Sequence, residues 1–158
     1  MRGLFPGTFN PPTIGHREII KRAAKVCEHL YIGVGTNTLK ETSLFSFNER
    51  KAMLEEIIKP LKNVEVITFN GLVSDFAKKN GIDVIVRGLR SVSDFDMERE
   101  MALANLAMEG VETLFLMAEG KHVNISASLI REIGKFGHDL KEFIPEEIAE
   151  IVSQRLSE

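Results

Sequence analysis

The sequence is poor in cysteine, tryptophan and tyrosine, and it carries no basic excess: one Cys, no Trp and one Tyr occur among 158 residues, and the formal net charge is −3. A lone Cys27 excludes an internal disulfide framework, so we expect a reducing compartment, the cytoplasm. An acidic balance gives no general attraction for nucleic acid. No apolar run approaches the ~18 residues of a bilayer span, and the apolar stretch before Pro6 is too short for a secretory signal. Neither a nucleic acid nor a membrane is an expected partner.

What the sequence does contain is typical of a folded globular protein. Hydrophobic residues make up 44% and charged residues 27% of the chain. A length of 158 residues suits one domain with a single core. No linker, repeat or low-complexity tract divides the sequence, so we expect one domain spanning residues 1–158.

Short apolar runs alternate with segments of helical periodicity along the chain. Strands are predicted just before Pro6 and at residues 30–35, 64–69, 82–86 and 113–117. Helices are predicted from residue 15, after the capping box at residues 46–49, at residues 72–79, 93–109 and 126–133, and from Pro145. This order predicts an α/β fold, a parallel five-stranded sheet with helices on both faces and C-terminal helices. Ligands of such sheets bind beyond the carboxyl ends of the strands.

The stretch at residues 6–16, Pro-Gly-Thr-Phe-Asn-Pro-Pro-Thr-Ile-Gly-His, is the most informative in the chain. It predicts a strand end, a tight loop and a helix start. In that arrangement, backbone N–H groups and the positive end of the helix face an anion. Thr8 and His16 place a hydroxyl and an imidazole on the same loop, so the anion can react there as well as bind.

Other polar residues also follow predicted strands and converge on one rim. The cationic and hydroxyl side chains expected there are His16, Lys40, Arg87, Arg90, Thr8, Ser126 and Ser128. Three permanent cations in an acidic protein need a local anionic partner to offset their repulsion. A substrate with several phosphates supplies it.

Several residues near the predicted rim also have an ordinary structural interpretation. Lys40 beside Glu41 is typical of a surface lysine, and Glu98 of a charge on the surface of a helix. The serines near residue 126 can serve only as helix caps. The methionines are expected to fill the core: Met97, Met101, Met108 and Met117. No His/Cys pair has the spacing of a structural zinc site.

Taken together, two motifs carry a family resemblance. Thr-Ile-Gly-His at residues 13–16 resembles the (H/T)xGH signature of the nucleotidyltransferase superfamily. Arg-Gly-Leu-Arg at residues 87–90, followed by an acidic and aromatic stretch to Glu98, resembles the phosphopantetheine adenylyltransferase family within it. The resemblance implies a Rossmann-like nucleotidyltransferase fold. It also implies transfer of AMP from ATP to 4′-phosphopantetheine, which gives dephospho-coenzyme A and pyrophosphate, with Mg²⁺ accompanying ATP.

The resemblance also implies a role for individual residues. The implied catalytic residues are His16, Thr8, Lys40 and Arg90. The implied phosphopantetheine site is Thr8, Lys40, Val73 and Arg87. The implied ATP site is Thr8, Phe9, His16, Gly88, Leu89, Arg90, Glu98, His122, Val123, Asn124, Ile125, Ser126, Ala127 and Ser128. No residue is expected to bind a metal directly. The family further implies a homo-hexamer and inhibition by coenzyme A.

The sequence departs from the family pattern at three places. Asn10 stands where the family usually has Asp, Ala127 interrupts a triple serine, and residues 122–124 replace common aromatic residues. Asn-Pro-Pro at residues 10–12 is similar to the nicotinate-mononucleotide adenylyltransferase branch, which is the second hypothesis. A nucleotide-binding regulatory module without catalysis is the third.

Overall fold

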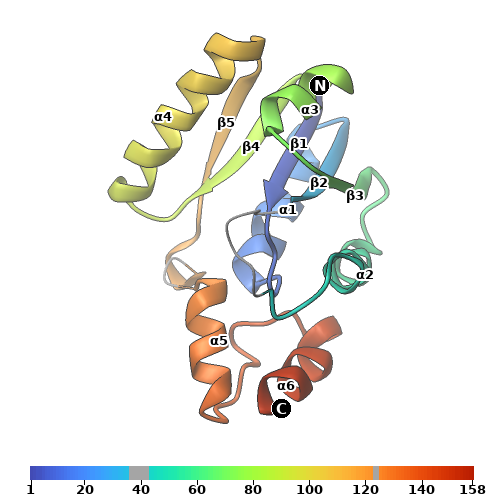
Figure 1. Ribbon diagram of the computed structural model, residues 1–158, viewed down its shortest axis with the longest axis vertical. Helices are drawn as coiled ribbons and strands as arrows, with labels where there is room; N and C mark the ends of the chain where they lie inside the picture. The colour runs from blue at the N-terminus through green and yellow to red at the C-terminus, as the bar shows by residue number, and fades with distance from the viewer. Residues whose placement is uncertain (36–42, 123–124) are drawn as a thin grey trace.

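The computed structural model describes residues 1–35, 43–122 and 125–158 (Figure 1). Five strands form one sheet: β1 Arg2–Gly7, β2 His29–Gly35, β3 Val64–Phe69, β4 Val84–Leu89 and β5 Glu112–Met117. Six α-helices accompany them within these described ranges: α1 Ile14–Val26, α2 Phe47–Ile58, α3 Val73–Lys79, α4 Val92–Glu109, α5 Ala127–Lys135 and α6 Ala149–Ser157. Two short 3-10 helices are Gly120–His122 and Glu146–Ile148. None of the helices among the described residues combines the length and hydropathy of a bilayer span.

All strand pairs described in the sheet are parallel, in the order β3-β2-β1-β4-β5. The chain therefore moves outward from β1 to one edge and then returns to the other side of β1. Between β1 and β4 the strand order reverses, and open sheets of this kind bind ligands at that switch point. The predicted α/β fold with a parallel five-stranded sheet is confirmed.

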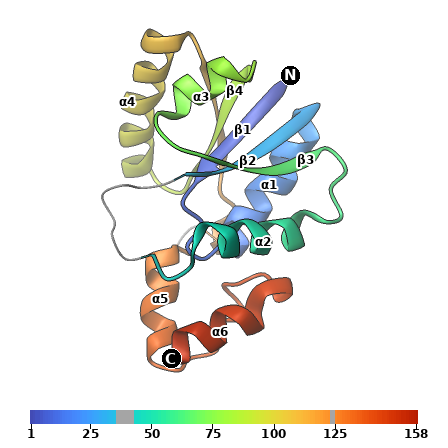
Figure 2. The same ribbon diagram turned by 45° about the vertical axis from the view of Figure 1, so that its right-hand side comes forward.

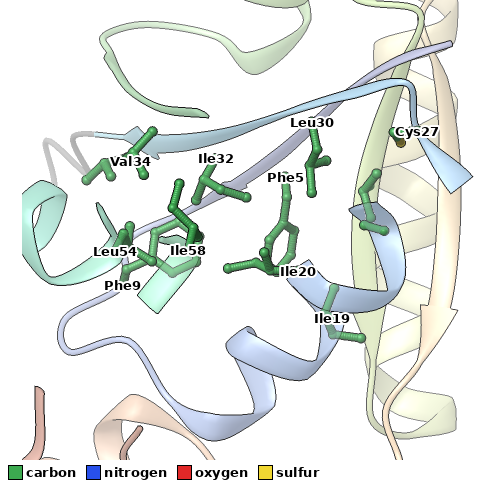
Figure 3. Close-up of a cluster of buried hydrophobic side chains, with 13 residues drawn as sticks. Phe5, Phe9, Ile19, Ile20, Cys27, Leu30, Ile32, Val34, Leu54 and Ile58 are labelled. Atoms are coloured by element: carbon green, nitrogen blue, oxygen red, sulfur yellow. The ribbon is translucent and has the colours of Figure 1, made fainter. Parts of the chain in front are cut away.

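Helices cover both faces of the sheet, as the alternation of strand side chains requires. Phe5 of β1 belongs to the core beneath α1 and α2, with Ile20 and Leu54 (Figure 3). Its neighbour Leu4 belongs to the core on the opposite face, with Ala77 of α3. Figure 2 shows α3 and α4 on one side of the sheet and α1 and α2 on the other.

A third group of buried side chains joins the C-terminal helices to α2. It includes Met53 of α2, Ile130 of α5 and Val152 of α6. Because this core is continuous with α2, the C-terminal helices pack below the sheet, at the end where its ligand edge lies (Figure 1). The start of α5 is thereby held beside the loops that follow the strands.

Several predicted boundaries differ from the observed ones for identifiable reasons. Strand β4 runs to Leu89, so Arg87 and Gly88 lie within the strand rather than after it. They pair there with Phe115 and Leu116 of the neighbouring strand, a long-range contact that local sequence does not reveal. The last helix begins at Ala149, preceded by a 3-10 turn.

Cys27 lies at the end of α1 inside the core labelled in Figure 3, and only 4% of it is exposed. Burial raises the pKa of its thiol. A buried thiol with a raised pKa is a poor nucleophile.

Candidate active site

A cavity of about 1130 Å³ opens at the switch point between the carboxyl ends of β1 and β4. Its lining includes the loop after β1, the end of β4, the first turns of α2 and α4, and the start of α5. This volume exceeds that of most single-ligand pockets, which hold ~300–1,000 Å³. It can therefore take two substrates side by side.

The loop after β1 is shaped by close packing. A Cβ atom on Gly7 would lie 2.8 Å from Cζ of Phe9, so glycine is required there. Phe9 itself has a φ of 50°, in the left-handed region that non-glycine residues rarely adopt. Its ring is buried against Phe5. The aromatic packing thus holds the loop backbone in a conformation that the local sequence alone disfavours.

Thr13 and His16 start helix α1 with a reciprocal pair of hydrogen bonds. The backbone N–H of His16 donates to Oγ1 of Thr13 at 3.2 Å, and the backbone N–H of Thr13 donates to Nδ1 of His16 at 3.0 Å. An Nδ1 that accepts a hydrogen bond carries no proton, so a neutral ring keeps its proton on Nε2. The helix cap therefore selects the tautomer of the imidazole.

His16 is also neutral near physiological pH. Burial first, and then the positive charges of Arg90 and Arg87, lower its pKa from 6.5 to about 4. The ring stands edge-on to Phe9 with the two centroids 4.9 Å apart. At neutral pH the cavity thus contains a fixed, uncharged N–H donor among permanent cations.

Arg87 and Arg90 line the cavity from the end of β4 and the turn before α4. Arg87 donates to both carboxylate oxygens of Glu98 and through Nη1 to the carbonyl of Pro6 at 3.2 Å. Arg90 donates through Nε to Asp94 at 3.2 Å. Each guanidinium is therefore held by a carboxylate of α4. Glu98 does not behave as a solvated surface charge, because its side chain is 19% exposed and ion-paired.

The start of α5 offers backbone donors to an anion. Ser126 caps the helix, and its hydroxyl accepts from the N–H of Leu129 at 3.1 Å. Ala127 and Ser128 form the first two helical positions, whose N–H groups have no partner within a helix. Replacing a serine by Ala127 removes a hydroxyl but keeps these N–H groups.

Apolar side chains form another wall of the cavity. Val73 and Phe69 line it from α3 and β3, and Met97 and Met101 from α4. The prediction that the methionines fill the core is wrong: Met97 is 68% and Met101 58% exposed, and Met108 and Met117 are also exposed. Helix α4 contains one buried residue, Asn105, among its described positions. One side of α4 contacts the sheet, where Phe95 packs against Phe115, but much of its apolar surface is exposed.

Most of the residues singled out from the sequence meet at this cavity. The lining includes Thr8, Phe9, His16, Val73, Arg87, Gly88, Arg90, Glu98, Ile125, Ser126, Ala127 and Ser128. Leu89 is instead buried in the core. His122 ends the 3-10 helix Gly120–His122. Lys40, Val123 and Asn124 lie outside the described residues.

Two arginines that the sequence interpretation missed also line the cavity. Arg50 of α2 donates to the carbonyl of Thr8, and Arg131 of α5 donates to the carbonyl of Asn10 and to Oγ of Ser128. The sequence carries only a positional hint for each, which does not reveal burial. Arg50 continues the apolar stripe of α2, and Arg131 follows Ala127 by one helical turn.

Asn10, which stands where the family usually has aspartate, is buried and links two segments of the chain. Its Oδ1 accepts from the backbone N–H of Phe45 at 3.0 Å, and its carbonyl accepts from Arg131. The amide thus ties the loop after β1 to the segment that enters α2.

The donor set of the cavity does not suit a resident metal ion. Over the described residues, no group of three or more His, Cys, Asp or Glu side chains is placed to hold one. The two carboxylates in the described lining, Asp94 and Glu98, are each paired with an arginine.

Comparison with known proteins places the chain among the nucleotidyltransferases. Residues 4–133 match the family described as cytidylyltransferase-like. A protein from Finegoldia magna named phosphopantetheine adenylyltransferase is 45% identical over 156 residues, which is 98% of this chain and 96% of that protein. A protein of the same name from Alkaliphilus metalliredigens is 42% identical, covering 97% of this chain and 98% of the relative.

A solved structure from Francisella tularensis has the same fold. It is a bifunctional NMN adenylyltransferase/ADP ribose pyrophosphatase complexed with AMP and Mn ion, and it superposes with a TM-score of 0.74 at 18% identity. The match covers 99% of this chain and 49% of that one, so the chain spans about half of the bifunctional protein.

Proposed function

The chain belongs to the phosphopantetheine adenylyltransferase family of cytidylyltransferase-like proteins, and from this premise we propose how its cavity moves AMP from ATP to 4′-phosphopantetheine. The products are dephospho-coenzyme A and pyrophosphate, a step of coenzyme A synthesis. One observation carries the proposal: His16, Arg87 and Arg90 line a single cavity that also has an apolar wall. Cations and donors suit two phosphates, and the apolar wall suits the pantetheine arm.

The reaction needs no general base from the protein. A phosphate monoester has a second pKa of ~6, so the acceptor is largely a dianion near neutrality. One of its oxygens attacks the α-phosphorus of ATP, a new P–O–P linkage forms, and the bond to pyrophosphate breaks. The protein aligns two mutually repelling phosphates and stabilises charge on the transferring group.

His16 donates to the α-phosphate in this proposal. The neutral ring with its proton on Nε2 provides a donor whose position is fixed by Thr13 and Phe9. A preorganised donor of this kind contributes ~2.7–4 kcal/mol to transition-state stabilisation.

The leaving pyrophosphate is bound by Arg90 and the start of α5. The first backbone N–H groups of α5 and the hydroxyl of Ser128 line the same side of the cavity as Arg131. Arg131 supplies an additional cation where Ala127 has removed a hydroxyl. Adenosine is assigned to Gly88 and Glu98, by resemblance.

The acceptor occupies the other side. Thr8 and Arg87 bind the phosphate of phosphopantetheine, with Lys40 assigned to the same phosphate by resemblance. Val73 and the methionines of α4 accept the pantetheine arm. ATP enters as its Mg²⁺ complex, since the described lining provides no unpaired carboxylate to hold the ion.

Release of pyrophosphate with a panel of acceptors tests the proposal. MgATP with 4′-phosphopantetheine should give pyrophosphate, and pantetheine, which lacks the phosphate, is the matched negative control. Turnover with nicotinate mononucleotide, and none with phosphopantetheine, would instead indicate nicotinate-mononucleotide adenylyltransferase activity. ATP binding by calorimetry with no turnover of any acceptor would favour the regulatory module.

We further propose a homo-hexamer in which helix α4 is covered by another copy. The exposed apolar side chains of α4 support this: Val92 is 81% and Leu103 54% exposed. Light scattering should give six times the 17.7 kDa of the chain. Leu103→Glu should lower that mass, whereas Ile151→Glu on the exposed part of α6 should not.

Coenzyme A is proposed as an inhibitor, because it carries both the pantetheine arm and the adenosine of the product. Inhibition competitive with phosphopantetheine is the expected result. The cytoplasm is the proposed compartment, which suits a protein with one buried cysteine.

A further inference from the structure

Arg50 is an almost completely buried cation on the wall of the cavity. It is 3% exposed, although arginine is almost never fully buried unless it is paired. None of the carboxylates in the described parts of the chain lies within ion-pair distance of it. Burial lowers the pKa of its guanidinium, which nevertheless stays charged at neutral pH. A buried charge without an opposite charge is costly, so the fold retains Arg50 against a free-energy penalty.

The contacts of Arg50 are with backbone carbonyls and an aromatic ring. Nη1 donates to the carbonyl of Thr8 at 2.8 Å, and Nε donates to the carbonyl of Ser46 at 3.4 Å. The guanidinium carbon lies 4.4 Å from the centroid of Phe47. The capping box of Ser46 and Glu49 fixes the first turn of α2 that carries it. Arg50 is therefore a rigid connection between α2 and the loop after β1.

The carbonyl that Arg50 holds belongs to the peptide that joins Thr8 to Phe9. In a trans peptide the C=O and N–H groups point in opposite directions. Anchoring the carbonyl therefore also orients the N–H of Phe9, on the side away from Arg50. Phe9 has the left-handed φ of 50°, and none of the described residues accepts a hydrogen bond from its N–H.

We propose that Arg50 is a positioning residue for adenylyl transfer: it fixes the peptide between Thr8 and Phe9 so that the N–H of Phe9 donates to a phosphate of bound ATP. The inference rests on the proposed function and adds a residue to it. Arg50 acts through the loop rather than on the reacting atoms. Its buried positive charge also offsets the negative charge gathered in the cavity.

Two readouts test this role in purified full-length protein. The first is steady-state kinetics of Arg50→Gln, for which we expect kcat to fall about tenfold or more and the Kd for ATP to rise by a smaller factor. The second is the amide resonance of Phe9 in ¹⁵N-phenylalanine-labelled protein. Adding ATP should shift it in the wild-type chain, and the shift should be lost in Arg50→Gln.

Lys51→Met is the matched control. It removes a positive charge from the next position of α2, where the side chain is exposed and paired with Glu55, without touching the loop after β1. Its kcat and its Phe9 shift should equal those of the wild type. Equal losses in Lys51→Met and Arg50→Gln would overturn the proposal, since net charge alone would then explain them.

Arg50→Lys decides the outcome if Arg50→Gln does not fold, as judged by circular dichroism. A lysine keeps the charge but lacks the planar fork that reaches two carbonyls, so kcat and the Phe9 shift should both be reduced. Wild-type values for both in Arg50→Lys would overturn the proposal. If the wild-type chain turns over no phosphopantetheine, the proposed function fails, and the Phe9 shift with ATP alone still tests Arg50.

Discussion

Arg87 and Glu98 form a bidentate ion pair that connects the end of β4 to helix α4 at the wall of the cavity. Nε of Arg87 lies 2.7 Å from one carboxylate oxygen, Nη2 donates to the other, and Nη1 donates to the carbonyl of Pro6. Three of the five N–H groups of the guanidinium are thus used within the chain. The remaining two are held in a fixed orientation and are available to a phosphate.

The two arginines of the rim should have separable effects on the substrates. Arg87→Ala is expected to raise the KM for phosphopantetheine at least tenfold with a smaller change for ATP, and Arg90→Ala should do the reverse, because each loses a charge-assisted hydrogen bond. Initial rates with each substrate varied in turn provide the measurement. Arg22→Ala is the control, because Arg22 is absent from the described cavity lining and donates to the carbonyl of Met117. Equal effects of Arg87→Ala and Arg90→Ala on both substrates would contradict the division of the cavity.

His16→Ala should lower kcat about a hundredfold or more and leave the Kd for ATP within about threefold, since the donor acts on the transferring phosphate. Rapid-quench measurement of pyrophosphate and calorimetry of ATP binding check the two expectations. His16→Asn keeps an acceptor for the N–H of Thr13, so it separates loss of the helix cap from loss of the donor. An asparagine variant with wild-type turnover would remove the imidazole from the mechanism.

The lowered pKa of His16 should make the folded chain less stable in mild acid. Its pKa is about 4 in the folded chain against 6.5 ordinarily, so between these values the unfolded chain binds a proton that the folded chain does not. The free energy of unfolding contributed by this group is complete above pH 6.5 and is lost as the pH falls toward 4. Urea unfolding at pH 7 and pH 5 should show a larger difference for the wild type than for His16→Gln. Equal differences would contradict a lowered pKa.

Gly134→Ala should destabilise the protein by about 1–3 kcal/mol through overpacking. A Cβ atom there would overlap Cδ1 of Leu156 and lie 3.1 Å from its Cβ, at the contact of α5 with α6. The higher helix propensity of alanine offsets only part of this cost. Thermal unfolding provides the measurement. Gly120→Ala, with open space around its Cα and no positive φ, should leave Tm nearly unchanged.

The fold could be predicted from the sequence because each strand and helix carries its own local pattern. The apolar run from residue 30 and the capping box at Ser46 predict their elements without any distant contact. Placing polar residues after the strands then follows from the direction of a parallel sheet. The convergence of His16, Arg87 and Arg90 could be anticipated for the same reason, whereas Lys40 lies outside the described residues.

The residues that escaped prediction are those whose environment comes from far along the chain. Arg50 donates a hydrogen bond to the backbone carbonyl of Thr8, and Arg131 donates one to the backbone carbonyl of Asn10. A charged residue on an apolar stripe has no local feature that separates a buried position from an exposed one. The prediction for the methionines of α4 was wrong in the opposite sense, because an apolar helix face has the same sequence pattern whether it is buried in the core or lines an open cavity.

The reciprocal bonds between Thr13 and His16 make the orientation and the tautomer of the imidazole depend on the first turn of α1. A nascent copy whose first helical turn has not formed holds neither the correct ring nitrogen protonated nor the ring in place. Under the proposed role of His16, such a copy lacks a fixed donor to the α-phosphate, so turnover during refolding requires that this turn has formed.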